Sequence, residues 1–204
     1  MIFLTKAEIK QLFTSLRSSH NLSENQLKTR HLIVDRNETI LTLFLYYGLT
    51  LQELTSLRMN QIHFETNTIS LNTALEPRII TLSLEHKLLF YKYYETIPTP
   101  VRPRYHDNDP FLVAFDFQRG TFRWVYEEDK PKTLTDIAVQ RMLQKEIKRS
   151  GLRKGISAQH LRNTFILMEI SKDKSISEIQ KELGLKTEIS LKKYFQYAKA
   201  KALN

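Results

Sequence analysis

The 204-residue sequence contains no cysteine, which excludes both a disulfide framework and a thiolate metal site. Its six histidines show neither HExxH nor HxH spacing, so the common histidine signatures of zinc sites are missing. From these absences we expect no metal and no cofactor. A cysteine-free chain is suited to a reducing compartment, and we expect a cytoplasmic protein.

Long apolar runs are absent as well. The most apolar stretch, Ile40 to Tyr47, is far shorter than the roughly 20 residues that span a bilayer as a helix. The first residues, MIFLTKAEIKQLF, lack a basic segment followed by a long apolar one, which a secretion signal would have. We therefore expect neither secretion nor membrane insertion. Internal repeats and low-complexity segments are also absent.

Apolar residues make up 41% of the chain and aromatic residues 10%, which is enough to bury a core without disulfides or metals. We expect one domain over residues 1–204. Its last residues, 195–204, form a tail that either extends the final helix or detaches from it.

Positive charge is concentrated in the last third of the sequence. Residues 1–140 carry 16 Lys and Arg and 16 Asp and Glu, whereas residues 141–204 carry 15 and 6. The whole net charge of +9 thus lies after residue 140. A segregated basic segment is typical of a polyanion partner, because each cation that meets a phosphate releases condensed counterions. Charge alone leaves open a solvated basic face without a partner.

Helix-start signals are frequent. Thr5 with Glu8, and Thr50 with Glu53, form T-x-x-E capping boxes, and apolar residues at helical spacing follow the first of them. Residues 18–32 are polar and predict a connector. Asp35 then caps a helix that is apolar on nearly all sides over residues 40–47, and Gly48 ends it. Further helices are predicted after Ser83, Thr135, Ser157 and Thr187, and over residues 177–183.

Strand-like patterns fill the middle of the chain. Residues 61–84 contain three β-branched runs separated by turn residues, which predicts a small antiparallel sheet. Residues 98–132 are the least regular and predict a loop that contains a hairpin. The helix after Thr135 should bury one apolar face, made of Ile137, Met142, Leu143 and Ile147. The predicted fold class is α+β and mostly helical.

Two segments carry a resemblance to a known family. Residues 36–62, RNETILTLFLYYGLTLQELTSLRMNQI, are similar to the buried helix that ends in G-L-R-x-x-E-L in the catalytic domain of the tyrosine recombinase (phage integrase) family. Thr50 stands where the first catalytic arginine of that motif belongs. Residues 158–165, AQHLRNTF, resemble the family's H-x-L-R-H-T-F. Arg162 matches its arginine, while Gln159 and Asn163 replace its two histidines.

A third segment, residues 182–195 or ELGLKTEISLKKYF, resembles L-G-H-x-S-I-x-T-T-x-x-Y. Its register places Tyr194 on the family's nucleophile and Leu185 on its histidine or tryptophan. Between the first two segments, LNTALEPRIITL resembles the hairpin of the catalytic lysine and places Thr73 roughly at that position. The sequence has no lysine between Lys28 and Lys87. The resemblance covers about residues 33–195 and implies the tyrosine recombinase catalytic-domain fold.

In the family, two arginines and a lysine neutralise the scissile phosphate, histidines move protons, and the tyrosine forms a covalent 3′-phosphotyrosyl link without a metal. Here Arg162 is the one cation of that set, and Tyr194 is retained. Removing one preorganised donor costs about 100–1000-fold in rate, so the resemblance implies a degenerate active site. If the chain is active, Tyr194 and Arg162 are its catalytic residues.

Each of these residues also has an ordinary structural explanation. Tyr194 could be a core residue near a helix end. Arg162 could pair with a buried acid such as Glu53 and tie two helices together, and the Thr50 hydroxyl is predicted to be occupied by its helix cap. Gln159 and His160 could be ordinary first-turn residues of a helix.

DNA binding requires a different set of side chains. Backbone N–H groups at helix starts favour phosphate, and amide side chains can pair with adenine. The residues expected to contact DNA are Arg162, Gln159, His160, Asn163, Arg153, Lys154, Lys186, Lys192, Lys193 and Arg78. Residues 157–194 alone could also form a helix-turn-helix.

The leading hypothesis is a double-stranded DNA-binding protein of integrase-like fold from a phage or mobile element, acting as a regulator or accessory factor in the nucleoid or an infected host cell. We expect the family's N-terminal arm-like domain to be lacking and the protein to oligomerise on DNA, with the tail exchanged between subunits. The alternative is an active site-specific recombinase that cuts and rejoins DNA through Tyr194. A third possibility is a protein-interaction module.

Overall fold

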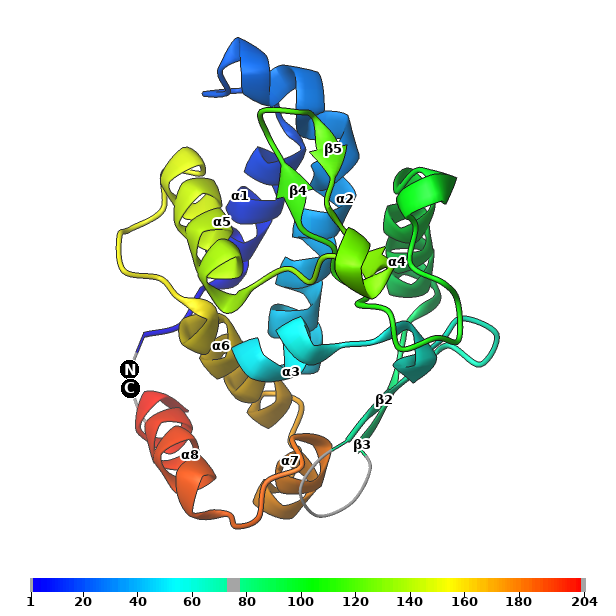
Figure 1. The fold of residues 1–204 in the computed structure, drawn as a ribbon. Helices are drawn as coiled ribbons and strands as arrows, with labels where there is room; N and C mark the ends of the chain where they lie inside the picture. Colours follow the sequence, from blue (N-terminus) through cyan, green and yellow to red (C-terminus); the bar gives the residue numbers. More distant parts are fainter. Residues whose placement is uncertain (1, 73–77, 203–204) are drawn as a thin grey trace.

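A single long helix organises the protein (Figure 1). The computed structural model describes residues 2–72 and 78–202. The eight α-helices of that part of the chain are α1 (Lys6–Arg17), α2 (Glu24–Tyr47), α3 (Leu51–Ser56), α4 (Leu84–Thr96), α5 (Asp136–Arg149), α6 (Ala158–Ile170), α7 (Ile176–Glu182) and α8 (Ile189–Ala202). Over these described residues, none of the helices combines the length and apolar character that a membrane crossing requires.

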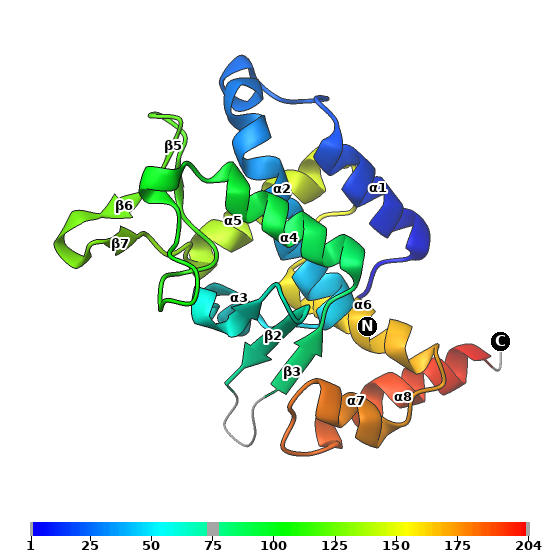
Figure 2. The ribbon, with the colours of Figure 1, turned by 90° about the vertical axis from the view of Figure 1, so that its right-hand side faces the viewer.

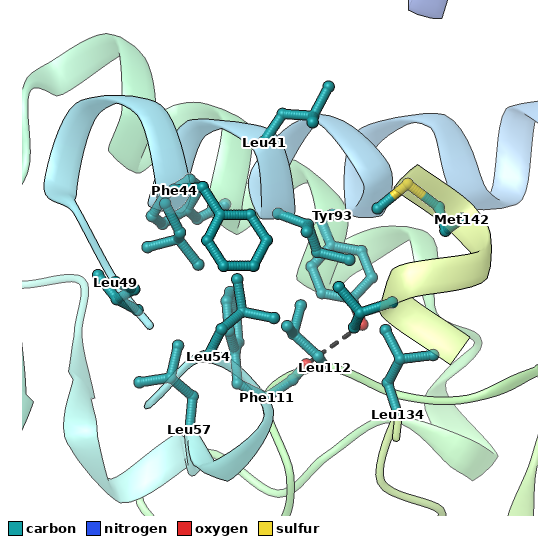
Figure 3. Packing of buried hydrophobic residues seen from close by; sticks show 14 of the residues in the cluster. Leu41, Phe44, Leu49, Leu54, Leu57, Tyr93, Phe111, Leu112, Leu134 and Met142 are labelled. Atoms are coloured by element: carbon teal, nitrogen blue, oxygen red, sulfur yellow. Dashed lines mark hydrogen bonds between the residues drawn. The ribbon is translucent and has the colours of Figure 1, made fainter. Parts of the chain in front are cut away.

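Helix α2 forms the centre of the core, and α1, α4 and α6 pack around it (Figures 1 and 2). Ile40, Leu41, Phe44 and Leu45 on its C-terminal half are fully buried, as its all-round apolar sequence predicts. Figure 3 shows Leu41 and Phe44 above a layer from α3 and the loop after α4. The hydroxyl of Tyr93, a buried residue of α4, donates to the backbone carbonyl of Phe111 in that loop at 3.2 Å. This packing fixes the end of α2, where the site residues lie.

The predicted connector over residues 18–32 is wrong in its second half. Helix α2 begins at Glu24, and its N-cap Ser23 forms a capping box with the Gln26 side chain, an S-x-x-Q version of the signal. Asp35 lies in the middle of the helix rather than at its start. Its buried carboxylate is 2.9 Å from Arg17 of α1 and 3.3 Å from Lys92 of α4. Polar residues of α2 are thus buried because other helices supply partners for them.

A second buried acid joins α2 to α5. The Glu146 carboxylate accepts from Arg30 at 2.6 Å, from Asn37 at 3.2 Å and from Arg149 at 2.8 Å, and these contacts hold its pKa below the usual value despite burial. Ile137, predicted on the buried face of α5, is 61% exposed, and Val139 takes the buried position instead. Residue 137 lies in the first turn of α5 and outside the helix face on which the buried apolar residues recur every three or four positions.

The middle of the chain forms the predicted antiparallel sheet. Strands β1 (Ile62–His63), β2 (Thr68–Leu71) and β3 (Arg78–Thr81) pair in the order β1-β2-β3, with Ile69 opposite Ile80. The predicted loop at residues 98–132 contains two short hairpins rather than one, namely β4 (Phe115–Asp116) with β5 (Thr121–Phe122), and β6 (Trp124–Val125) with β7 (Lys130–Pro131). Three 3-10 turns complete the described elements: η1 (Met59–Gln61), η2 (Thr99–Val101) and η3 (Tyr126–Glu128). The mostly helical α+β class is confirmed.

The last three helices have a small core of their own. Phe165, Ile179, Leu183, Leu191 and Tyr194 form a cluster of buried residues separate from the main core. The tail extends α8 through Ala202. At the other end of the chain, the ring of Phe3 lies 5.5 Å from that of Tyr197 on α8, so both described ends of the chain meet at α8 (Figure 1).

Gly48 joins the two cores. It ends α2 with φ +61°, and a Cβ atom at this position would lie 2.4 Å from the ring of Phe165 on α6. A side chain would therefore meet both a left-handed backbone and an overpacked contact. We predict that Gly48→Ala lowers the free energy of unfolding by about 2–3 kcal/mol, measured by urea denaturation. Gly155 also has a positive φ but open space around it, so Gly155→Ala serves as the control for backbone strain alone. Equal losses in the two variants would contradict the packing argument.

Candidate functional site

Arg162 lies at the junction of α6 with the end of α2. Its Nη1 donates to the carbonyl oxygen of Gly48 at 2.5 Å and lies 3.3 Å from the Glu53 carboxylate. The side chain is 9% exposed. The predicted ion pair with Glu53 is confirmed. Burial lowers the pKa of Arg162, and the Glu53 charge opposes that shift.

Arg78 meets the same acid from the sheet. Its Nη2 donates to the Tyr47 carbonyl oxygen at 2.5 Å, and its Nη1 is 3.3 Å from the other oxygen of Glu53. The Arg78 side chain is 4% exposed, which does not suit the predicted contact with a DNA backbone. One carboxylate therefore serves two guanidinium groups, and sequence reasoning did not identify this shared role of Glu53.

Tyr194 is buried against α6. Its hydroxyl donates to Oδ1 of Asn163 at 2.6 Å, and the same oxygen accepts from Nε2 of Gln159 at 2.9 Å. Burial raises the pKa of Tyr194, while the charge of Arg162 acts in the opposite direction. The hydroxyl is thus directed at an amide.

Asn163 links this cluster to the start of the chain. Its Nδ2 donates to the Ile2 carbonyl oxygen at 3.2 Å, and Thr164 next to it accepts from the Leu4 N–H at 2.8 Å. Asn163 is buried, and both ends of its amide have partners within the protein. A base contact by Asn163 would require these bonds to be exchanged, whereas Gln159 at the start of α6 is exposed.

The substituted positions have structural roles. The Thr50 hydroxyl accepts from the Glu53 N–H at 3.1 Å, so its predicted use as a helix cap is confirmed. Leu185 is half-buried beside the α6–α8 cluster. His160 belongs to the cap of α6, where its Nδ1 lies 3.1 Å from the Ser157 N–H. Thr73 lies outside the described residues.

The predicted cations fall into two groups. Arg153 contacts Glu8 and the Phe3 carbonyl oxygen, so it fastens the start of the chain. The four lysines predicted to bind DNA are exposed: Lys154, Lys186, Lys192 and Lys193. Lys193 also lies over the ring of Tyr194, 5.1 Å from its centroid. Lys193 therefore lies beside Tyr194 as an exposed cation, whereas the buried Arg78 and Arg162 are paired with Glu53.

Phosphoryl transfer makes specific demands on a site. A phosphodiester transition state gathers charge on its nonbridging oxygens and needs preorganised cationic donors around it. The charge of Arg162 acts on Tyr194, the Lys193 ammonium lies over the Tyr194 ring, and amides and a helix cap lie beside them. This constellation can bind a polar ligand through its exposed rim.

No family model matches the chain. The chain is 26% identical over 157 residues to "Tyrosine recombinase XerD-like" from Streptococcus suis strain 05ZYH33, and the match includes 77% of this chain. A second strain, 98HAH33, has a protein with the same match. The chain spans 53% of the length of these curated relatives.

Solved structures agree with that similarity. The chain superposes on XerA recombinase with a TM-score of 0.69 at 19% identity, covering 95% of this chain and 58% of the other. The chain superposes on XerH site-specific recombinase bound to difH substrate with a TM-score of 0.70 at 17% identity, covering 100% of this chain and 53% of the other. It superposes on Tn1549 transposon integrase in complex with transposon right end DNA with a TM-score of 0.68 at 16% identity, covering 98% of this chain and 65% of the other. The chain has the fold of the tyrosine recombinase catalytic domain.

Proposed function

We propose that this protein binds double-stranded DNA through the basic face around α7 and α8 and is impaired in strand cleavage. Its role would be that of a regulator or accessory factor of a phage or mobile element. The observation that carries the proposal is the separation of charges: Lys186, Lys192 and Lys193 are exposed, while Arg162 and Arg78 share one internal acid. The exposed cations can meet phosphates, and the buried ones already have partners.

The comparisons support the duplex as partner. Two of the similar structures, XerH site-specific recombinase and Tn1549 transposon integrase, are complexes with DNA. Exposed lysines next to helix starts suit phosphate, because backbone N–H groups there add to the attraction. Gln159 is the exposed amide at the start of α6 and is the residue best placed for a base edge. Lys154 precedes the same helix start.

The loss of chemistry rests on the pocket. Thr50 replaces an arginine and caps its own helix, and the Tyr194 hydroxyl donates to Asn163 rather than facing a base that could take its proton. Losing a general acid or base costs about 100–10,000-fold. The rate losses are not additive when the catalytic groups act as a unit, but few of the family's catalytic groups are left in this chain.

Selection of bound fragments tests the binding half of the proposal. Purified protein would be mixed with sheared genomic DNA of the source, and the retained fragments would be sequenced. We expect one enriched motif and an affinity for it at least about 1000-fold above random duplex, as is usual for specific sites. Retention without any enriched motif would favour the protein-interaction reading, in which the basic face only keeps the protein soluble.

The second candidate function is an active site-specific recombinase. The observation in its favour is Tyr194 itself, which lies near enough to Arg162 for the guanidinium charge to act on its hydroxyl. A duplex with a nick beside the cleavage position would trap a covalent adduct if Tyr194 attacked phosphorus. We expect wild type and Tyr194→Phe to give the same background in a denaturing gel. An adduct that only wild type forms would establish the recombinase.

A further inference from the structure

A histidine and a glutamate at the end of strand β1 lie close to a second histidine that is distant in the sequence. His63 ends β1, Glu65 follows it in the turn to β2, and His106 lies in the loop after η2. One donor atom of each side chain lies within 4.8 Å of the others. Imidazole nitrogens with a carboxylate oxygen are the donor set that zinc prefers where thiolates are lacking. We propose that His63, Glu65 and His106 bind a zinc ion.

The donor spacing is close to that of a bound ion. A tetrahedral zinc with bonds of about 2.1 Å holds its ligand atoms roughly 3.4 Å apart. Nε2 of His106 is 3.6 Å from Oε1 of Glu65. The third donor, on His63, lies within 4.8 Å of the other two, so the three donors are already gathered at one place. Three protein ligands leave a fourth position for water or another ligand.

Tyr105 positions the carboxylate. Its hydroxyl donates to Oε2 of Glu65 and accepts from the Phe64 N–H at 3.1 Å, which leaves Oε1 for His106. The two rings of Tyr105 and His106 lie 3.9 Å apart, and Phe64 stacks on Tyr105 at 5.8 Å. Such outer partners orient ligands in metal sites.

The backbone that presents His106 is fixed from both sides. Asn60 and Met59 donate to the carbonyl oxygens of Asp107 and Asp109 at 2.8 Å and 2.9 Å, and Arg104 holds the Asp109 carboxylate at 2.9 Å. Within this anchored loop His106 has φ +64°, a left-handed conformation that is uncommon for residues other than glycine, although Asn, Asp and His adopt it more often than most. A loop that holds a histidine in this way keeps its ring beside strand β1.

The sequence could not show this site, because its histidines have no metal-site spacing and His106 is 41 residues from Glu65. An ordinary Glu–His pair would need only Glu65 and His106, and His63 adds the third donor. The proposal does not depend on DNA binding. A zinc ion bound here would connect strand β1 of the sheet to the loop at residues 104–109.

Zinc binding to the purified full-length chain tests the proposal. After treatment with a chelator, the protein would be titrated with zinc chloride and its metal content measured. We expect about one zinc per chain, with affinity lowered at least tenfold in His63→Ala and in His106→Asn, and about tenfold in Tyr105→Phe. Asparagine tolerates a positive φ, so His106→Asn should keep the loop folded. The matched control is the double variant His20→Ala, His31→Ala, which removes two exposed histidines elsewhere.

Thermal unfolding gives a second readout. Zinc at about 100 times its dissociation constant should raise the melting temperature of wild type by roughly 5–10 °C and leave that of His106→Asn unchanged. Zinc bound equally by wild type, His63→Ala and His106→Asn would overturn the proposal. So would the failure of wild type to retain zinc, or loss of binding only in the control variant.

Discussion

Glu53→Ala is expected to lower the free energy of unfolding by about 3–5 kcal/mol. Glu53 faces two arginines whose side chains are 4% and 9% exposed, and removal of the acid would leave both buried guanidinium groups without their ion-pair partner. Its Oε2 also accepts from the Thr50 N–H at 2.7 Å, so the cap of α3 would weaken at the same time. Urea denaturation followed by circular dichroism measures the loss.

Two further variants separate the causes of this loss. Adding Arg78→Met to Glu53→Ala should recover part of the stability, because an apolar side chain replaces one uncompensated charge, with a coupling of about 0.5–3 kcal/mol. Glu95→Ala removes an exposed acid on α4 and should change stability by less than about 0.5 kcal/mol. A loss in Glu53→Ala as small as in Glu95→Ala would show that the shared carboxylate does not hold the site together.

The combined change Lys186→Ala, Lys192→Ala and Lys193→Ala is expected to weaken duplex binding by about 1000-fold, or about 4 kcal/mol. All three lysines are exposed, two on α8 and one in the turn before it, and each is assigned one phosphate contact. The slope of log affinity against log salt should become shallower by about 0.9 per lost contact. Fluorescence anisotropy with a labelled duplex measures both quantities.

A charge-matched variant is the control for this prediction. Lys6, Lys10 and Lys28 are also exposed, but they lie on α1 and α2. Their joint replacement by alanine lowers the net charge by the same amount and should change duplex affinity by less than tenfold at physiological salt, where the Debye length is about 8 Å. Equal losses in the two triple variants would mean that net charge, and not the α7–α8 face, determines binding.

Local signals in the sequence predicted most helix starts. Capping residues at Thr5, Thr50 and Ser83 are N-caps in the structure, because their hydrogen bonds lie within one turn. The start of α2 was missed because its first half is polar. Arg30 and Asn37 can lie in the helix interface because their side chains donate to Glu146 on α5. This partner is more than 100 residues away, so a local sequence pattern does not indicate it.

The candidate site could be predicted only in part, because some of its contacts join residues that are distant in the sequence. The family resemblance identified Arg162 and Tyr194 as site residues, and the ion pair considered for Arg162 with Glu53 is present in the structure. The use of Asn163 depends on the Ile2 carbonyl oxygen, which is distant in sequence. Whether a cation is free or already paired is therefore a property of the folded chain.

The most direct test of retained binding with lost cleavage uses one nicked duplex that carries the selected motif. The protein would be mixed with it, and the sample divided between a native gel and a denaturing gel. We predict a complex on the native gel at low ionic strength that dissociates completely under denaturing conditions. A protein–DNA band that survives denaturation and requires Tyr194 would contradict the loss of chemistry, and failure to form any complex at low ionic strength would contradict DNA binding.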